Sequence, residues 1–168
     1  MKCIKKLVAL TLAAVLALAM LTACSGTPSV PETAEATKQI VDNINAVRTK
    51  NGLSALEINT AATDVASKIV ALEEKKKLNL ISEEEYENAR SELHAIQVDG
   101  RSRNGYVGRT SASSGEKVMT EEYWQKLYDA DEMNRSDYRI VRSADAVYVG
   151  VAMKQLSNGV YIMAVVTY

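Results

Sequence analysis

This chain of 168 residues has few histidines and cysteines, the residue types that most often act as metal ligands or nucleophiles. It has one histidine, His94, and two cysteines, Cys3 and Cys24. A structural zinc site needs about four Cys or His ligands, so the composition excludes one, and two cysteines cannot build a disulfide framework. No Gly-x-Ser-x-Gly motif occurs, and no motif places a Ser or Cys nucleophile beside a histidine. The Gly-Tyr-Val-Gly segment at 105–108 lacks the strand-then-helix context of a phosphate-binding loop.

The first 24 residues have the pattern of an export signal. Lys2, Lys5 and Lys6 precede an almost uninterrupted apolar run over residues 7–23. This run is shorter than the ~20 residues of a membrane span, and polar residues follow it, which is typical of a secretory signal peptide. Residues 21–24, Leu-Thr-Ala-Cys, resemble the lipobox of bacterial lipoproteins. That resemblance implies cleavage after residue 23 and acylation of Cys24.

Charge limits the partners of the exported chain. Cleavage before Cys24 removes three lysines and no acidic residue, which leaves 17 basic residues against 21 acidic ones. This mildly acidic balance excludes nucleic-acid binding through bulk positive charge. We therefore expect an extracytoplasmic protein, anchored to the bacterial cell membrane through lipidated Cys24. The alternative, an uncleaved N-terminal anchor, also places most of the chain outside the cytoplasm.

Hydrophobic spacing predicts helices after a Ser/Thr/Pro/Gly-rich tether, residues 24–36. Ala36, Ile40, Ile44 and Val47 predict a helix that ends at Asn51-Gly52. A second helix begins at Asn59 or Thr60, and a capping box of Ser82 and Glu85 begins a third. The expected apolar faces of the second and third helices are Ala62, Val65, Ala66, Ile69 and Leu72, then Tyr86, Ala89 and Leu93. The charged run at 73–77 is interpreted as a solvated helix face.

The second half of the chain predicts β structure at its end. Residues 97–118 are expected to form a loop, with at most a short strand at Tyr106-Val107. Thr120 caps a helix that carries Trp124. Alternating apolar residues from Val147 to Met153 and a turn at Asn158-Gly159 predict a terminal hairpin. Helices first and a hairpin last indicate the α+β class.

A series of short motifs resembles the CAP superfamily in its bacterial branch, which is related to cysteine-rich secretory proteins, antigen 5 and pathogenesis-related 1 proteins. The motifs are Asn45-Ala46-Val47-Arg48, Asn51-Gly52-Leu53, Asp99-Gly100-Arg101, Gly115-Glu116, Trp124 and Val149-Gly150-Val151. The resemblance implies a three-layer α-β-α sandwich over residues 37–168. It also implies structural roles for Asn45, Arg48, Gly52, Asp99, Gly100, Trp124 and Gly150.

The same resemblance implies a depleted catalytic site. His94 and Glu116 match a family histidine and glutamate, whereas Asp137 lies at the second histidine position and Leu127 at the second glutamate position. A His, Glu and Asp set could hold a divalent metal as a three-ligand site. His94 and Glu116 are therefore the candidate metal ligands, with Asp137 as a third. We otherwise expect no cofactor.

Three functions remain open. The preferred one is a non-enzymatic module that binds a protein, cell-wall or lipid ligand, in which the loop at 96–118 forms one wall of a groove lined by Tyr and Trp side chains. The alternative is a metal-dependent hydrolase, which requires His94, Glu116 and Asp137 to converge. The third is a structural envelope lipoprotein with no sizeable concave site.

Overall fold

The computed structural model describes residues 33–111, 118–130 and 135–168. The helices in these ranges are α2 (Thr33–Lys50), α3 (Thr60–Lys77), α4 (Glu83–Ala95), α6 (Glu121–Asp129) and α7 (Ser136–Arg142). The strands are β1 (Glu57–Ile58), β2 (Gly105–Ser111), β3 (Tyr148–Gln155) and β4 (Tyr161–Thr167). None of these helices is both long and apolar enough to cross a membrane.

The four strands form one mixed sheet in the order β1-β3-β4-β2. β3 and β4 form the terminal hairpin, in which Val149 lies opposite Thr167. β2 runs antiparallel to β4 along its whole length, and β1 adds a short parallel pairing to the start of β3. The expected mixture of helices and a terminal hairpin is confirmed at the level of the α+β class.

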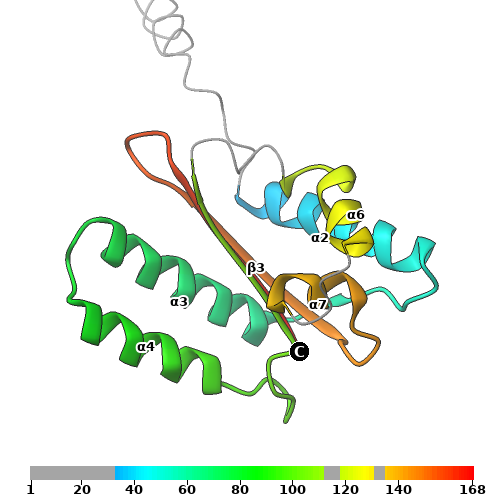
Figure 1. The fold of residues 1–168 in the computed structure, drawn as a ribbon, viewed down its shortest axis with the longest axis horizontal. Coiled ribbons are helices and arrows are strands. Elements are labelled where there is room, and N and C mark those ends of the chain that lie inside the picture. Colours follow the sequence, from blue (N-terminus) through cyan, green and yellow to red (C-terminus); the bar gives the residue numbers. More distant parts are fainter. Residues whose placement is uncertain (1–32, 112–117, 131–134) are drawn as a thin grey trace, which may run out of the picture. The chain divides into compact units, whose positions relative to one another are not determined.

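Helices cover both faces of the sheet, which Figure 1 shows almost edge-on. α3 packs on β3 and β4, and α4 packs on the outer side of α3. α2 contacts β3, α7 contacts β2, and α6 packs on both of these helices. The face under α3 buries Ala152, Ile162, Ala164 and Val166. Since successive strand residues point to opposite faces, their neighbours Val151, Met163 and Val165 are buried on the other face. The central strands are therefore apolar on both sides, as a doubly covered sheet requires.

Close contact between α3 and the sheet depends on Gly150. A Cβ atom at this position would lie 2.1 Å from the backbone carbonyl carbon of Ala62 in the first turn of α3. Only a residue without a side chain lets a helix approach a strand so closely. Asn59 caps α3 by accepting hydrogen bonds from the N–H groups of Ala61 and Ala62.

Local signals in the sequence predicted the end of α2 and the starts of α3, α4 and α6. The apolar stripe of α2 is buried, Gly52 has the positive φ of a helix terminator, and the capping box of Ser82 and Glu85 is present. Thr120 caps α6 as expected, since its hydroxyl accepts from the N–H of Tyr123. α2 begins at Thr33, so this helix includes residues that were assigned to the tether and starts before the expected domain boundary at 37.

Two parts of the second half differ from expectation. The predicted loop at 97–118 contains a seven-residue strand, β2. The Gly-rich sequence of this segment does not suggest a strand of that length, but the open edge of β4 supplies its hydrogen-bonding partner. The helix α7 was not predicted. It has no side-chain N-cap bond and is stabilised instead by burial of Tyr138, Ile140 and Val141.

Arg48 connects four segments of the chain from inside the protein. Its side chain is fully buried, and its guanidinium donates to the carbonyl oxygens of Ser54 (2.9 Å), Ile140 (3.1 Å), Ser143 (3.0 Å) and Ala146 (3.5 Å). Burial lowers the pKa of this guanidinium. The four carbonyls partly compensate its charge, so Arg48 joins the end of α2, the segment after it, the end of α7 and the entry to β3.

We predict that Arg48→Met lowers the free energy of unfolding by about 3 kcal/mol or more, because buried carbonyls lose charged donors. Arg48→Lys should recover only part of this loss, since one ammonium cannot reproduce the spread of a planar guanidinium. Denaturation of the full chain in mild detergent, followed by circular dichroism, measures both variants. Arg139→Gln, an exposed α7 position, is the control and should change stability by less than ~0.5 kcal/mol. Equal stability of Arg48→Met and the control would contradict the role of Arg48.

Candidate functional site

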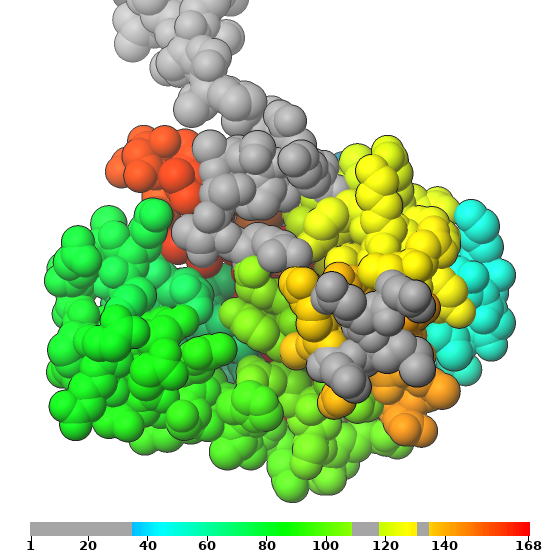
Figure 2. Space-filling view, in the orientation of Figure 1, coloured from blue at the N-terminus to red at the C-terminus, as the bar shows by residue number. Residues whose placement is uncertain are grey.

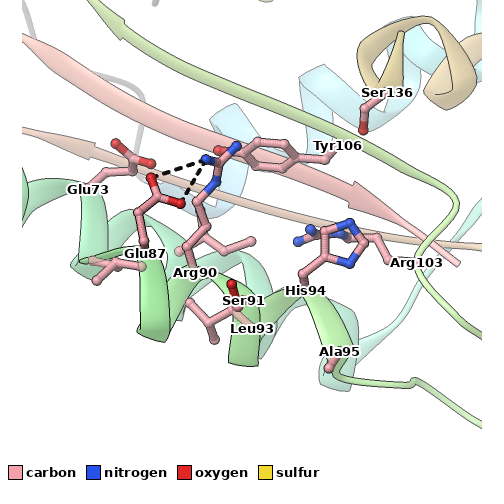
Figure 3. Close-up of a pocket in the computed structure, with 12 residues that line it drawn as sticks. Glu73, Glu87, Arg90, Ser91, Leu93, His94, Ala95, Arg103, Tyr106 and Ser136 are labelled. Atoms are coloured by element: carbon pink, nitrogen blue, oxygen red, sulfur yellow. Dashed lines mark hydrogen bonds and ion pairs between the residues drawn. The ribbon is translucent and has the colours of Figure 1, made fainter. Parts of the chain in front are cut away.

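A surface cavity of about 420 Å³ lies between the α3–α4 pair and the start of β2. Figure 2 shows the hollow between the green α3–α4 pair and the yellow-green chain of β2, and Figure 3 shows its side chains. Its floor is apolar and its rim is polar. The lining residues are Ile69, Leu72, Glu73, Glu87, Arg90, Ser91, Leu93, His94, Ala95, Arg103, Tyr106 and Ser136.

Contacts between α3 and α4 hold one wall of this cavity. The Tyr86 hydroxyl donates to Glu73 Oε1 at 2.7 Å, and Lys76 pairs with Glu83 where α4 begins. The Lys76 ammonium also lies 5.1 Å from the centre of the Tyr86 ring. No α4 residue is fully buried, so these contacts and the partly buried stripe that includes Leu93 fix α4 on α3.

Two arginines and two glutamates, Glu73 and Glu87, are the charged residues of the cavity lining. Arg90 on α4 is exposed and pairs with Glu87 at 3.4 Å. Arg103 is partly buried, and its guanidinium carbon lies 5.2 Å from the centre of the Tyr106 ring. Burial lowers the pKa of Arg103, and the positive charge of Arg90 lowers it further, whereas the phenols of Tyr168 and Tyr106 oppose this. The two arginines are therefore close enough to repel each other.

Of the three expected metal ligands, the structure describes His94 and Asp137, and only His94 lines the cavity. His94 is exposed and lines the cavity from the last turn of α4. Asp137 is buried at the start of α7, where it pairs with Arg135 at 3.1 Å, and it does not line the cavity. Glu116 lies outside the described residues. Within residues 33–111, 118–130 and 135–168, no three His, Cys, Asp or Glu side chains could hold a metal ion.

The residues expected in structural positions have structural contacts. Asn45 donates to the Leu56 carbonyl at 3.0 Å and accepts from its N–H at 2.7 Å, which closes the connection after α2. Trp124 is fully buried and donates to the Val118 carbonyl at 2.9 Å. Asp99 has positive φ and accepts from Asn59 at 3.0 Å, and Gly100 after it also has positive φ. Cys24 lies outside the described residues.

The groove expected beside the loop at 96–118 is present only in part. This segment contributes Arg103 and Tyr106 to the cavity wall, so the expected tyrosine is there. The expected tryptophan is not, because Trp124 is wholly enclosed by the core. Leu127, at the position where the family would have a glutamate, is also buried.

Sequence reasoning missed most of the cavity. Glu87, Arg90, Ser91 and His94 recur at three- and four-residue spacing and form a polar stripe beside the apolar stripe of α4, which is a signal that helical periodicity could have found. Arg103 has no such local signal, because its place depends on the pairing of β2 with β4.

Comparison with known proteins does not assign this chain to a family. No protein-family model matches this chain, and no curated protein matches it.

The Tyr86–Glu73 contact predicts an unusual titration. Burial, the hydrogen bond from Tyr86 and the charge of Glu73 together raise the Tyr86 pKa well above its ordinary value. The difference in ultraviolet absorbance between the wild type and Tyr86→Phe should therefore show no ionisation step up to pH ~11, whereas free tyrosine ionises near ~10. Glu73→Gln should move the step downward. A normal step in the wild type would contradict the contact.

The same rise in the Tyr86 pKa determines how its contribution to the free energy of unfolding depends on pH. Because the folded-state pKa of Tyr86 lies above the unfolded-state value of about 10, its contribution is fully present below that pH. It is lost as the pH rises through the folded-state pKa.

Proposed function

We propose that this chain is an extracytoplasmic lipoprotein, anchored to the bacterial cell membrane through Cys24, whose CAP-like domain binds a small ligand without catalysis. The observation that carries the binding function is the cavity between the α3–α4 pair and β2. Its volume of about 420 Å³ lies within the usual range for small-molecule sites. An apolar floor with a few convergent polar groups is also typical of such sites.

The assignment to a CAP-like sandwich is supported by the motif residues and by helices on both faces of the sheet. Arg48, Asn45, Gly52 and Gly150 each have a role that their residue type requires. The order of helices followed by a terminal hairpin agrees with the same family. This assignment is independent of the cavity, so each part of the proposal has its own test.

Binding is favoured over hydrolysis because His94 is the one candidate ligand among the described residues that lines the cavity. A hydrolytic metal site needs three protein ligands around one open position, and Asp137 is engaged with Arg135 away from the cavity. A structural protein with no concave site is disfavoured by the cavity itself.

The anchor is tested by substitution of Cys24. We expect the full chain, expressed in a bacterium with labelled fatty acid, to incorporate label and to sediment with membranes. Cys24→Ala should lose both label and signal-peptide cleavage, because diacylglycerol attaches to the thiol. Cys3→Ala is the matched control and should behave like the wild type. Label retained in Cys24→Ala would exclude the anchor.

The binding function is tested by filling the cavity. We expect some members of a set of small polar and apolar compounds to shift the amide resonances of α4 and β2 in the full chain in detergent micelles. Ser91→Trp, which places an indole at the lining, should abolish those shifts. Asn88→Trp changes an exposed α4 position outside the lining, so this variant should retain the resonance shifts. Shifts that survive in Ser91→Trp would place binding elsewhere.

A further inference from the structure

Arg103 is a charged group without a counter-ion. Within the part of the chain that the structure describes, its guanidinium has no ion pair and no hydrogen bond, and its contact is with the face of the Tyr106 ring. A guanidinium has five N–H donors. These donors are not among the buried atoms that lack a partner, so they can be reached from the open side of the cavity.

The charged groups that the structure describes near Arg103 do not form an ion pair with it. Arg90 is a second guanidinium that repels it. Of the two carboxylates in the lining, Glu73 accepts the Tyr86 hydroxyl, and Glu87 pairs with Arg90. The bond between Glu87 and Arg90 is long and exposed, which makes it weak and easy to displace.

One buried hydroxyl, that of Tyr168, interacts electrostatically with Arg103 but does not line the cavity. The Tyr168 side chain is fully buried, and its hydroxyl has no hydrogen-bond partner among the described residues. Burial raises the pKa of this phenol, and the positive charge of Arg103 opposes the rise. The hydroxyls of Ser91 and Ser136 and the His94 ring do line the cavity.

The rest of the lining suits an apolar body. Ile69 and Leu72 form a buried floor, and Leu93 is partly buried beside them. The Tyr106 ring lies under the Arg103 guanidinium, so an anion that pairs with Arg103 would bring the attached group near an aromatic face and these leucines. Figure 3 labels Leu93, Arg103 and Tyr106 among the side chains that line the pocket.

We propose that the ligand of this cavity is a small organic anion, a carboxylate or phosphate monoester attached to a compact apolar or aromatic group, with Arg103 as its main charge partner. This inference rests on the proposed binding function and adds the ligand class. A carboxylate or phosphate fits the planar fork of a guanidinium through two parallel hydrogen bonds. Arg90 binds the same oxyanion group from α4 once its weak bond to Glu87 is released.

The test compares four small aromatic probe molecules that differ in the charge of the group attached to the ring. Benzoate, phenyl phosphate, benzyl alcohol and benzylammonium are titrated into the full chain in uncharged detergent micelles, with amide resonances of α4 and β2 as the readout. We expect one or both anions to bind at least about tenfold more tightly than the alcohol, because charged hydrogen bonds are the stronger ones. Benzylammonium should not bind. The ranking of benzoate against phenyl phosphate distinguishes the two oxyanions.

Variants then assign the binding to Arg103. Arg103→Gln should weaken anion binding by about tenfold or more and leave the alcohol unchanged, and Arg103→Lys should recover part of the loss. Arg139→Gln, an exposed arginine on α7 outside the lining, is the matched control and should bind like the wild type. If Arg103→Gln does not fold, as judged by circular dichroism, Arg90→Gln replaces it and should also weaken the anions selectively.

The outcomes separate this inference from the proposed function. Equal binding of alcohol and anions, or anion binding unchanged in the Arg103 variant, would overturn the ligand class while leaving the cavity a binding site. Shifts from benzylammonium alone would do the same. If none of the four probes binds, the anion site is rejected, and the wider compound set with Ser91→Trp decides whether the cavity binds anything.

Discussion

The architecture depends on one buried cation, Arg48. Its guanidinium holds carbonyl oxygens from the segment after α2, from the end of α7 and from the entry to β3. The last two segments lie more than 90 residues beyond Arg48 in the sequence. A guanidinium is suited to this task because its donors point in several fixed directions in one plane. The helices on this face and the start of the hairpin are thereby placed together.

The opposite face is organised by close packing rather than by charge. Gly150 lets the first turn of α3 rest on β3, and α4 is held on α3 by the Tyr86–Glu73 hydrogen bond and the Lys76–Glu83 ion pair. α4 has no fully buried residue, so its position is set by this pair of contacts and by a shallow apolar stripe. The cavity therefore lies between a firmly packed sheet and a lightly held helix.

The sequence predicts the parts of this structure that local patterns determine. Helical spacing at Ile40, Ile44 and Val47, and caps at Asn59 and Ser82, are readable because the interacting atoms lie within a few residues. Only Tyr106-Val107 of β2 was predicted, and α7 was not predicted at all, because each element is stabilised by partners distant in sequence. The same holds for the candidate site. His94 was singled out because it is the one histidine of the sequence. Arg103 lies in the cavity because of the register of β2 on β4, which no local pattern in the sequence predicts.

Two arginines illustrate why burial alone does not identify a functional group. Arg48 is fully buried, yet four carbonyl oxygens satisfy its donors, and its role is complete within the fold. Arg103 is less buried but has an aromatic face in place of acceptors and a second cation nearby. Donors that face an open cavity can be reached by water and by a ligand, whereas donors enclosed within the fold cannot. The accessibility of its donors, rather than burial, is therefore what makes Arg103 and not Arg48 a candidate for ligand binding.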